Sequence, residues 1–134
     1  MATEPIWIIP EAVLAIHKRQ IAEHGGGSGL RDPGLLESAI AKPKNIFSYD
    51  KEKANIPGLA AAYAYGISRN HPFVDGNKRS GLLAAAVFLE ANGIRFAATE
   101  EDAVVQTLAL AAGAITAKDF ASWLEKVCGP EGAA

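Results

Sequence analysis

Apolar residues recur at helical spacing along most of the chain, and short turn-forming sequences separate the stretches that show it. The stretch from Ser80 to Asn92 is apolar almost all round, which predicts a helix in the middle of the domain. Stretches with the helical pattern begin at or beside Pro10, Asp32, Asn55, Ser80, Thr99 and Thr116. We therefore expect an all-α fold, one compact domain of about six helices.

Several helix boundaries can be predicted from single residues. Pro43 should end the second helix, because the residue before a proline avoids the helical conformation, and residues 43–55 should then be irregular. Side chains that accept hydrogen bonds from first-turn N–H groups predict N-caps at Asp32, Asn55, Thr99 and Thr116.

Two short apolar runs, Ile6 to Ile9 and Ile94 to Ala97, could pair as a very short β-ribbon. Gly129 and Pro130 interrupt the last helical pattern close to the end of the chain. We expect the domain to cover residues 1–128 and residues 129–134 to form a flexible tail.

Composition and charge narrow the classes of function. The chain has 134 residues and a net charge of −2, which argues against a protein that binds nucleic acid directly through a basic face. Its one cysteine, Cys128, cannot form an internal disulfide, which is compatible with a reducing cytosol. The sequence shows neither a signal peptide nor an apolar run of membrane-spanning length, so we expect a cytoplasmic protein.

The segment from His71 to Arg79 carries unusual chemistry for a turn between two apolar helices. Unpaired N–H groups at a helix start attract phosphate, and Gly76 lets the backbone approach a ligand closely. Lys78 and Arg79 add positive charge. An acidic Asp75 within this positive field suggests a cation, and Mg²⁺ is usually held by one or two carboxylates plus substrate phosphates.

Other polar residues allow more than one interpretation. His71 is the candidate proton acceptor, because a neutral imidazole can take a proton from an attacking hydroxyl. Asn77 could orient the loop or contact a phosphate. Arg69 could contact a phosphate or act as an ordinary cation at a helix end. His17 lies among apolar residues, which favours a hydrogen-bonded core histidine over a catalytic one.

The segment HPFVDGNKR resembles the signature of the Fic/Doc family, and the resemblance extends to GGGSGLRDPGLLESAIAKP, AAAYAYGISRNHPF and a late Trp-Leu pair. By position, it implies a catalytic base at His71 and a Mg²⁺ ligand at Asp75. It also implies a phosphate cradle made of Gly76, Asn77, Lys78 and Arg79. The family usually continues with threonine and alanine. This chain instead has Ser80 and Gly81, and the glycine should slightly weaken the helix start.

One position separates the branches of the family. Fic nucleotidyltransferases usually carry glycine where this chain has Lys78, whereas Doc proteins carry lysine. The resemblance thus implies a Doc-type toxin that transfers phosphate from ATP, with Mg²⁺, to a protein hydroxyl. By precedent this hydroxyl is a threonine of elongation factor Tu, and translation stops. AMP transfer of the Fic type and a non-catalytic nucleotide-binding or partner-binding role remain as alternatives.

A free toxin would harm its host, so the resemblance also implies a partner. In Doc systems this partner is a Phd-like antitoxin whose disordered C-terminal segment folds onto the toxin.

Overall fold

The structure, a computed structural model, describes residues 4–50 and 54–130. Within these ranges the chain forms six helices and two short strands: α1 (Pro10–His24), α2 (Pro33–Tyr49), α3 (Ile56–Asn70), α4 (Asn77–Ala91), β1 (Ile94–Phe96), α5 (Glu100–Ala112), α6 (Ala117–Val127) and β2 (Cys128–Pro130). The all-α prediction is confirmed. In the part of the chain described, no helix combines the length and apolar character needed to span a membrane.

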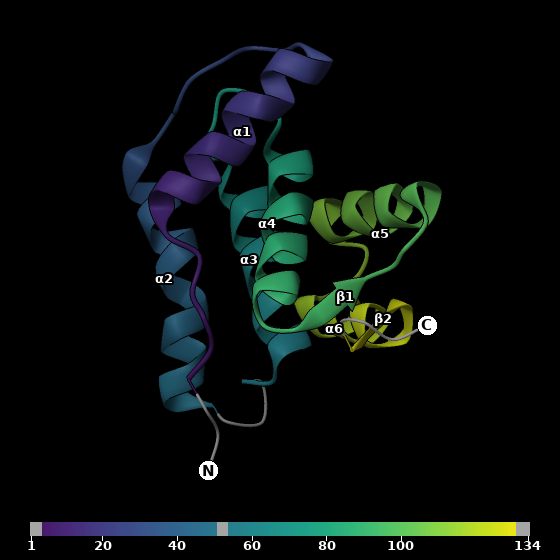
Figure 1. Ribbon diagram of the computed structural model, residues 1–134. Helices are drawn as coiled ribbons and strands as arrows, with labels where there is room; N and C mark the ends of the chain where they lie inside the picture. Colours follow the sequence, from purple (N-terminus) through teal and green to yellow (C-terminus); the bar gives the residue numbers. More distant parts are fainter. Residues whose placement is uncertain (1–3, 51–53, 131–134) are drawn as a thin grey trace.

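Helices α3 and α4 lie at the centre of the domain and pack closely on each other (Figure 1). Helix α2 flanks α3 on one side, and α6 flanks it on another. Helices α1 and α5 both contact α4. Helix α3 is buried over most of its surface, which its many alanines allow because small side chains let helix axes approach. The predicted central helix is confirmed, and α3 shares that position with it.

The predicted helix caps at Asp32 and Asn55 are present. The Asp32 carboxylate accepts the N–H of Leu35 at 3.1 Å, and the Asn55 side-chain oxygen accepts the N–H of Gly58 at 2.7 Å. Each cap satisfies a donor that has no partner inside its own helix.

The caps of the last two helices differ in one respect. Thr116 and Asp119 form a reciprocal capping box. Thr99 accepts the N–H of Asp102 at 3.2 Å, but the Asp102 carboxylate accepts the indole N–H of Trp123 at 2.6 Å instead. That bond ties the first turn of α5 to α6.

The predicted end of the second helix at Pro43 is wrong. Helix α2 continues through Pro43 to Tyr49, with Pro43 buried inside it. Ile46 and Phe47, on the added turn, pack against the hydrophobic core. Their partial burial offsets the hydrogen bond that the proline cannot donate. Of the segment expected to be irregular, residues 51–53 lie outside the described ranges.

The predicted pairing of the short β-ribbon is also wrong. β1 pairs in antiparallel fashion with β2, so that Arg95 lies opposite Gly129. The run from Ile6 to Ile9 satisfies its backbone through side chains instead. Ile6 donates its N–H to Asn92 Oδ1 at 2.8 Å and accepts Asn92 Nδ2–H at 3.0 Å.

Two boundaries differ from those predicted from the sequence. Helix α4 begins at Asn77, three residues before the expected Ser80, so the end of the candidate loop is its first turn. Gly129 and Pro130 belong to β2, so the expected tail does not begin at residue 129, and residues 131–134 lie outside the described ranges.

Candidate functional site

A cavity of about 360 Å³ opens between the start of α4 and the side of α5. The loop before α4 and the first turns of that helix form one wall, and α5 forms the other. Among the described residues, eleven line the cavity: His71, Val74, Asp75, Gly76, Asn77, Lys78, Arg79, Leu82, Val104, Thr107 and Leu108. Six of the seven predicted site residues are among them, so the structure brings them together.

The first turn of α4 combines positive charge with backbone N–H groups that have no partner in the helix. Gly76 caps the helix in the left-handed conformation (φ 76°) and offers no side-chain acceptor to the first-turn N–H groups. The backbone hydrogen bonds of the helix begin with the Ser80 N–H, which donates to the Gly76 carbonyl at 3.0 Å. This turn carries no acidic residue, and Lys78 and Arg79 are both exposed. Cations at the positive end of a helix dipole are unfavourable unless an anion joins them.

Asn77 holds the loop together from inside. Its side chain is buried, and its Oδ1 accepts the Phe73 N–H at 2.9 Å while its Nδ2 donates to the Phe73 carbonyl at 3.0 Å. Nδ2 also lies 3.5 Å from His71 Nδ1. Both ends of the amide are thus engaged within the loop. Of the two roles predicted for Asn77, this geometry supports orienting the loop.

His71 caps the end of α3 and lines the cavity. It is exposed, and its backbone is in the left-handed region (φ 51°, ψ 55°). Within the described ranges it is the only non-glycine residue with positive φ. Such a conformation is unfavourable for a residue with a Cβ atom and often marks a functional position.

Asp75 lines the same cavity. Oδ1 accepts the N–H of Gly76 at 2.8 Å, and Oδ2 accepts the N–H of Gly27 at 3.3 Å. Each oxygen keeps free lone-pair positions. No group of three or more His, Cys, Asp or Glu side chains gathers as a metal site in the described ranges. One carboxylate beside two exposed cations and free helix N–H groups would fit Mg²⁺ if phosphates supplied most of its other ligands.

Arg69 is the one predicted site residue outside the cavity. Its Nη1 lies 3.4 Å from the Ala111 carbonyl near the end of α5, and its guanidinium is 5.8 Å from the centre of the Tyr65 ring. Of the two interpretations of Arg69, this position matches a cation at a helix end.

Sequence reasoning missed the second wall of the cavity. Val104 and Leu108 on α5 are about half exposed, at 47% and 49% of their surface. Thr107 between them is buried, and its hydroxyl has no hydrogen-bond partner within the described ranges. Helical periodicity marks these positions as one face of a helix. It cannot tell that the face borders a cavity.

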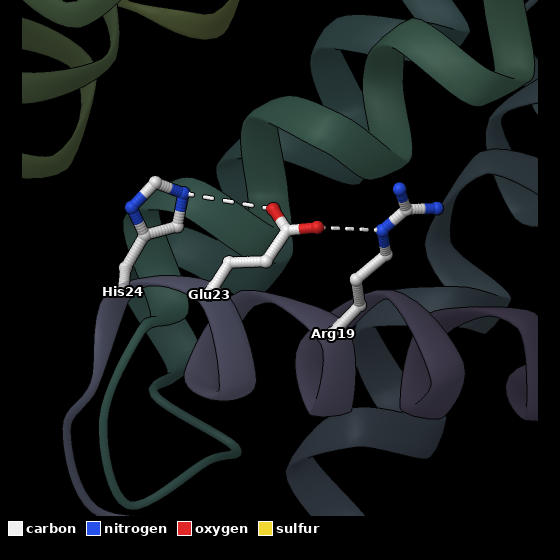
Figure 2. A network of polar contacts seen from close by, with 3 residues as sticks. All are labelled: Arg19, Glu23 and His24. Carbon is white, nitrogen blue, oxygen red and sulfur yellow. Dashed lines mark hydrogen bonds and ion pairs between the residues drawn. The ribbon is translucent and has the colours of Figure 1, made fainter.

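The other two histidines do not line the cavity. His17 is buried and hydrogen-bonded, as predicted: its Nε2 lies 2.7 Å from the Asp75 carbonyl. His24 belongs to an exposed network on α1 (Figure 2). In it, Glu23 accepts a hydrogen bond from Arg19 at 2.8 Å, and this bond lowers the pKa of the Glu23 carboxyl. Exposed ion pairs of this kind add little stability.

Comparison with known proteins gives concordant results. The model of the Fic/DOC family matches residues 7–89, which include the whole candidate loop. The protein kinase doc of Escherichia phage P1 is 33% identical over 122 residues, covering 91% of this chain and 95% of that protein. The toxin Doc of Mycolicibacterium smegmatis is 41% identical over 75 residues, covering 55% of this chain and 57% of that protein.

The family match spans α1 to α4 and includes the wall of the cavity that carries Lys78 and Arg79. One relative aligns over nearly its whole length, and both relatives carry the name Doc. The six helices, the loop before α4 and these matches agree, and the chain belongs to the Fic/Doc family.

Proposed function

We propose that this protein is a Doc-type toxin that transfers the terminal phosphate of ATP to a hydroxyl of a target protein in the cytoplasm. The observation that carries the proposal is the first turn of α4. Two exposed cations and unpaired N–H groups meet in this turn, which has no acidic residue of its own, and His71 lines the same cavity. A relative named a protein kinase supports the choice of reaction.

In this proposal the phosphates of ATP lie at the start of α4. Backbone N–H groups of the first turn, Lys78 and Arg79 hold phosphate oxygens, and the Arg79 guanidinium can bind two of them at once. Mg²⁺ held at Asp75 would offset part of the negative charge on the phosphates. The apolar residues of α5 limit the access of water to the other side of the cavity.

The chemical step then needs one proton acceptor. The hydroxyl oxygen of the target forms a bond to the terminal phosphorus of ATP, and the bond from that phosphorus to the leaving ADP oxygen breaks. His71 takes the hydroxyl proton through a ring nitrogen at the cavity. The remaining contributions come from positioning and from the fixed positive charge of the cradle.

The target and the partner follow from the family resemblance. We propose a threonine of elongation factor Tu as the acceptor, with arrest of translation as the result. A Phd-like antitoxin, bound through a segment that folds on the toxin, would keep the protein inactive.

The test is a reaction of purified protein with ATP and Mg²⁺ in a cell extract, followed by mass spectrometry of the modified protein. The proposal predicts one added phosphoryl group on a threonine of elongation factor Tu. An added adenylyl group would instead show AMP transfer. It would also show that a lysine at position 78 does not prevent the nucleotide from binding in the orientation that AMP transfer needs. No modification with either group, together with retained ATP binding, would support a non-catalytic binding protein.

A further inference from the structure

We infer that Arg31 is a positioning residue of the candidate site, holding the backbone of His71 in the conformation that keeps its imidazole at the cavity. The inference rests on the proposed function insofar as it concerns catalysis. It starts from the unfavourable left-handed conformation of His71, which persists only where surrounding groups hold it.

The guanidinium of Arg31 binds the backbone at His71 and can stabilise this conformation. Its Nε donates to the His71 carbonyl at 2.7 Å, and its Nη2 donates to the Asn70 carbonyl at 3.0 Å. Two adjacent N–H groups of one rigid, planar side chain therefore bind two successive carbonyls at the end of α3. The positive charge also lies at the negative end of that helix dipole, where it is favourable. Lysine, with a single ammonium group on a flexible stem, cannot reproduce this fork.

The backbone around Arg31 fixes the guanidinium relative to the loop. The N–H groups of Arg31 and Asp32 both donate to the Pro72 carbonyl, at 2.6 and 2.9 Å. Leu30 forms a β-bridge with Phe73, and Val74 donates its N–H to the Gly29 carbonyl at 3.1 Å. Segment 29–32 thus runs along the loop like a neighbouring strand. These bonds hold the Arg31 backbone in place, so the guanidinium is attached at a fixed position.

The glycines before this segment permit a close approach to the metal-ligand candidate. A Cβ atom added to Gly26 would lie 2.6 Å from Asp75 Oδ2, and one added to Gly27 would lie 2.9 Å from Val74 Cγ1. Residues 27–31 therefore contact the proposed base through Arg31 and the proposed metal ligand through the Gly27 N–H.

Arg31 does not act as a phosphate ligand in this arrangement. It is absent from the lining of the cavity, and its Nε and Nη2 groups are directed to the backbone at the end of α3. Its removal should therefore change the position of His71 and leave the phosphate cradle intact. This distinction separates a positioning role from a binding role.

The experiment compares Arg31→Ala and Arg31→Lys with wild type and with a control, Arg19→Ala. Arg19 is also exposed, and its Nε pairs with Glu23 on α1 (Figure 2). Amide hydrogen exchange is measured first, since it requires no activity. Both Arg31 variants should exchange faster in residues 71–76, with a melting temperature within about 3 °C of wild type. The control should exchange as wild type does.

Steady-state transfer of phosphate from ATP to elongation factor Tu is measured next. Arg31→Ala should lower kcat by roughly 10- to 100-fold, the size expected for a misplaced catalytic group, with the KM for ATP changed less than about twofold. Millimolar guanidinium should restore part of kcat in Arg31→Ala alone. Arg31→Lys should recover little.

Unchanged exchange in residues 71–76 of Arg31→Ala would overturn the inference. So would faster exchange with unchanged kcat, or a loss that lies wholly in the KM for ATP. If wild-type protein itself modifies nothing, the proposed function fails, and the exchange measurement alone decides whether Arg31 holds His71.

Discussion

His17 and Phe73 lie face to face, with ring centroids 3.8 Å apart and planes inclined by 4°. The Nε2 of His17 is also 2.7 Å from the Asp75 carbonyl, and because a carbonyl only accepts, this nitrogen carries the proton. One side chain of α1 therefore fixes the candidate loop twice, through a ring stack and a hydrogen bond. The loop is held from α1 and α4 as well as from segment 29–32.

Replacing His17 should separate these two contacts. His17→Phe keeps the stack and leaves the Asp75 carbonyl without its partner, which should cost about 1 kcal/mol of unfolding free energy. His17→Ala also loses the ring and leaves a cavity, so its cost should be larger, about 3 kcal/mol. Urea unfolding measures both values. Equal stability of the two variants would show that the stack with Phe73 contributes nothing.

Gly81 allows α3 and α4 to approach closely. A Cβ atom there would lie 2.7 Å from Ser68 Oγ and 3.0 Å from the Ala64 carbonyl oxygen. Gly81→Ala should therefore destabilise the protein by about 1–3 kcal/mol, although alanine is the better helix former. Thermal unfolding checks this.

A second substitution tests the cause of that loss. The Ser68 hydroxyl is buried and has no partner within the described ranges, so Ser68→Ala alone should be close to neutral. Combined with Gly81→Ala, it should regain part of the lost stability. A Gly81→Ala variant as stable as wild type would contradict the close packing.

The capping box of α6 should make stability depend on acid pH. The hydrogen bond from the Thr116 backbone N–H is the largest cause that lowers the pKa of the Asp119 carboxyl. A hydrogen bond with the Thr116 side chain lowers this pKa further. Because this pKa is lower in the folded protein, the ionised Asp119 stabilises the fold at pH values above the pKa of the unfolded chain, about 3.9. That contribution disappears as the pH falls through the folded-state pKa.

Asp119→Asn therefore should be less stable than wild type at neutral pH, and the difference should shrink as the pH falls below about 4. Urea unfolding at a series of pH values measures this difference. A gap that stays constant down to the acid limit would show that the charge of Asp119 has no part in it.

Lys78 should lower the stability of the free protein and strengthen its binding of ATP. Because it lies in the first turn of α4 without an acidic neighbour in that turn, Lys78→Ala should raise the stability of the free protein by a few tenths of a kcal/mol. The same change should weaken ATP binding by roughly tenfold or more, since it removes a charged contact to phosphate. Calorimetric titration and thermal unfolding measure the two effects. Unchanged ATP affinity would exclude Lys78 from the cradle.

Local chemistry explains what the sequence could predict. The caps at Asn55 and Thr116 depend on contacts three residues apart, and the pattern of the chain shows them directly. The candidate loop was found from its own residue types, because His71, Asp75 and Lys78 lie within nine positions. Six of the seven site residues meet at one cavity for this reason.

Contacts between distant segments explain the failures. Arg31 meets His71 across 40 positions, and its role has no local signature. The pairing of β1 with β2 depends on where α6 ends, and the extension of α2 past Pro43 depends on core contacts of the following turn. Arg69 has the right charge and the right sequence position, but its side chain turns toward α5.

The most direct test of the account is the transfer reaction of His71→Asn, measured together with its ATP affinity. Asparagine tolerates the left-handed backbone of this position and lacks a basic ring nitrogen. We predict a loss of phosphate transfer of roughly 10²- to 10⁴-fold, with ATP affinity close to that of wild type. Phosphate transfer at the wild-type rate in His71→Asn would contradict the proposal that this residue accepts the proton.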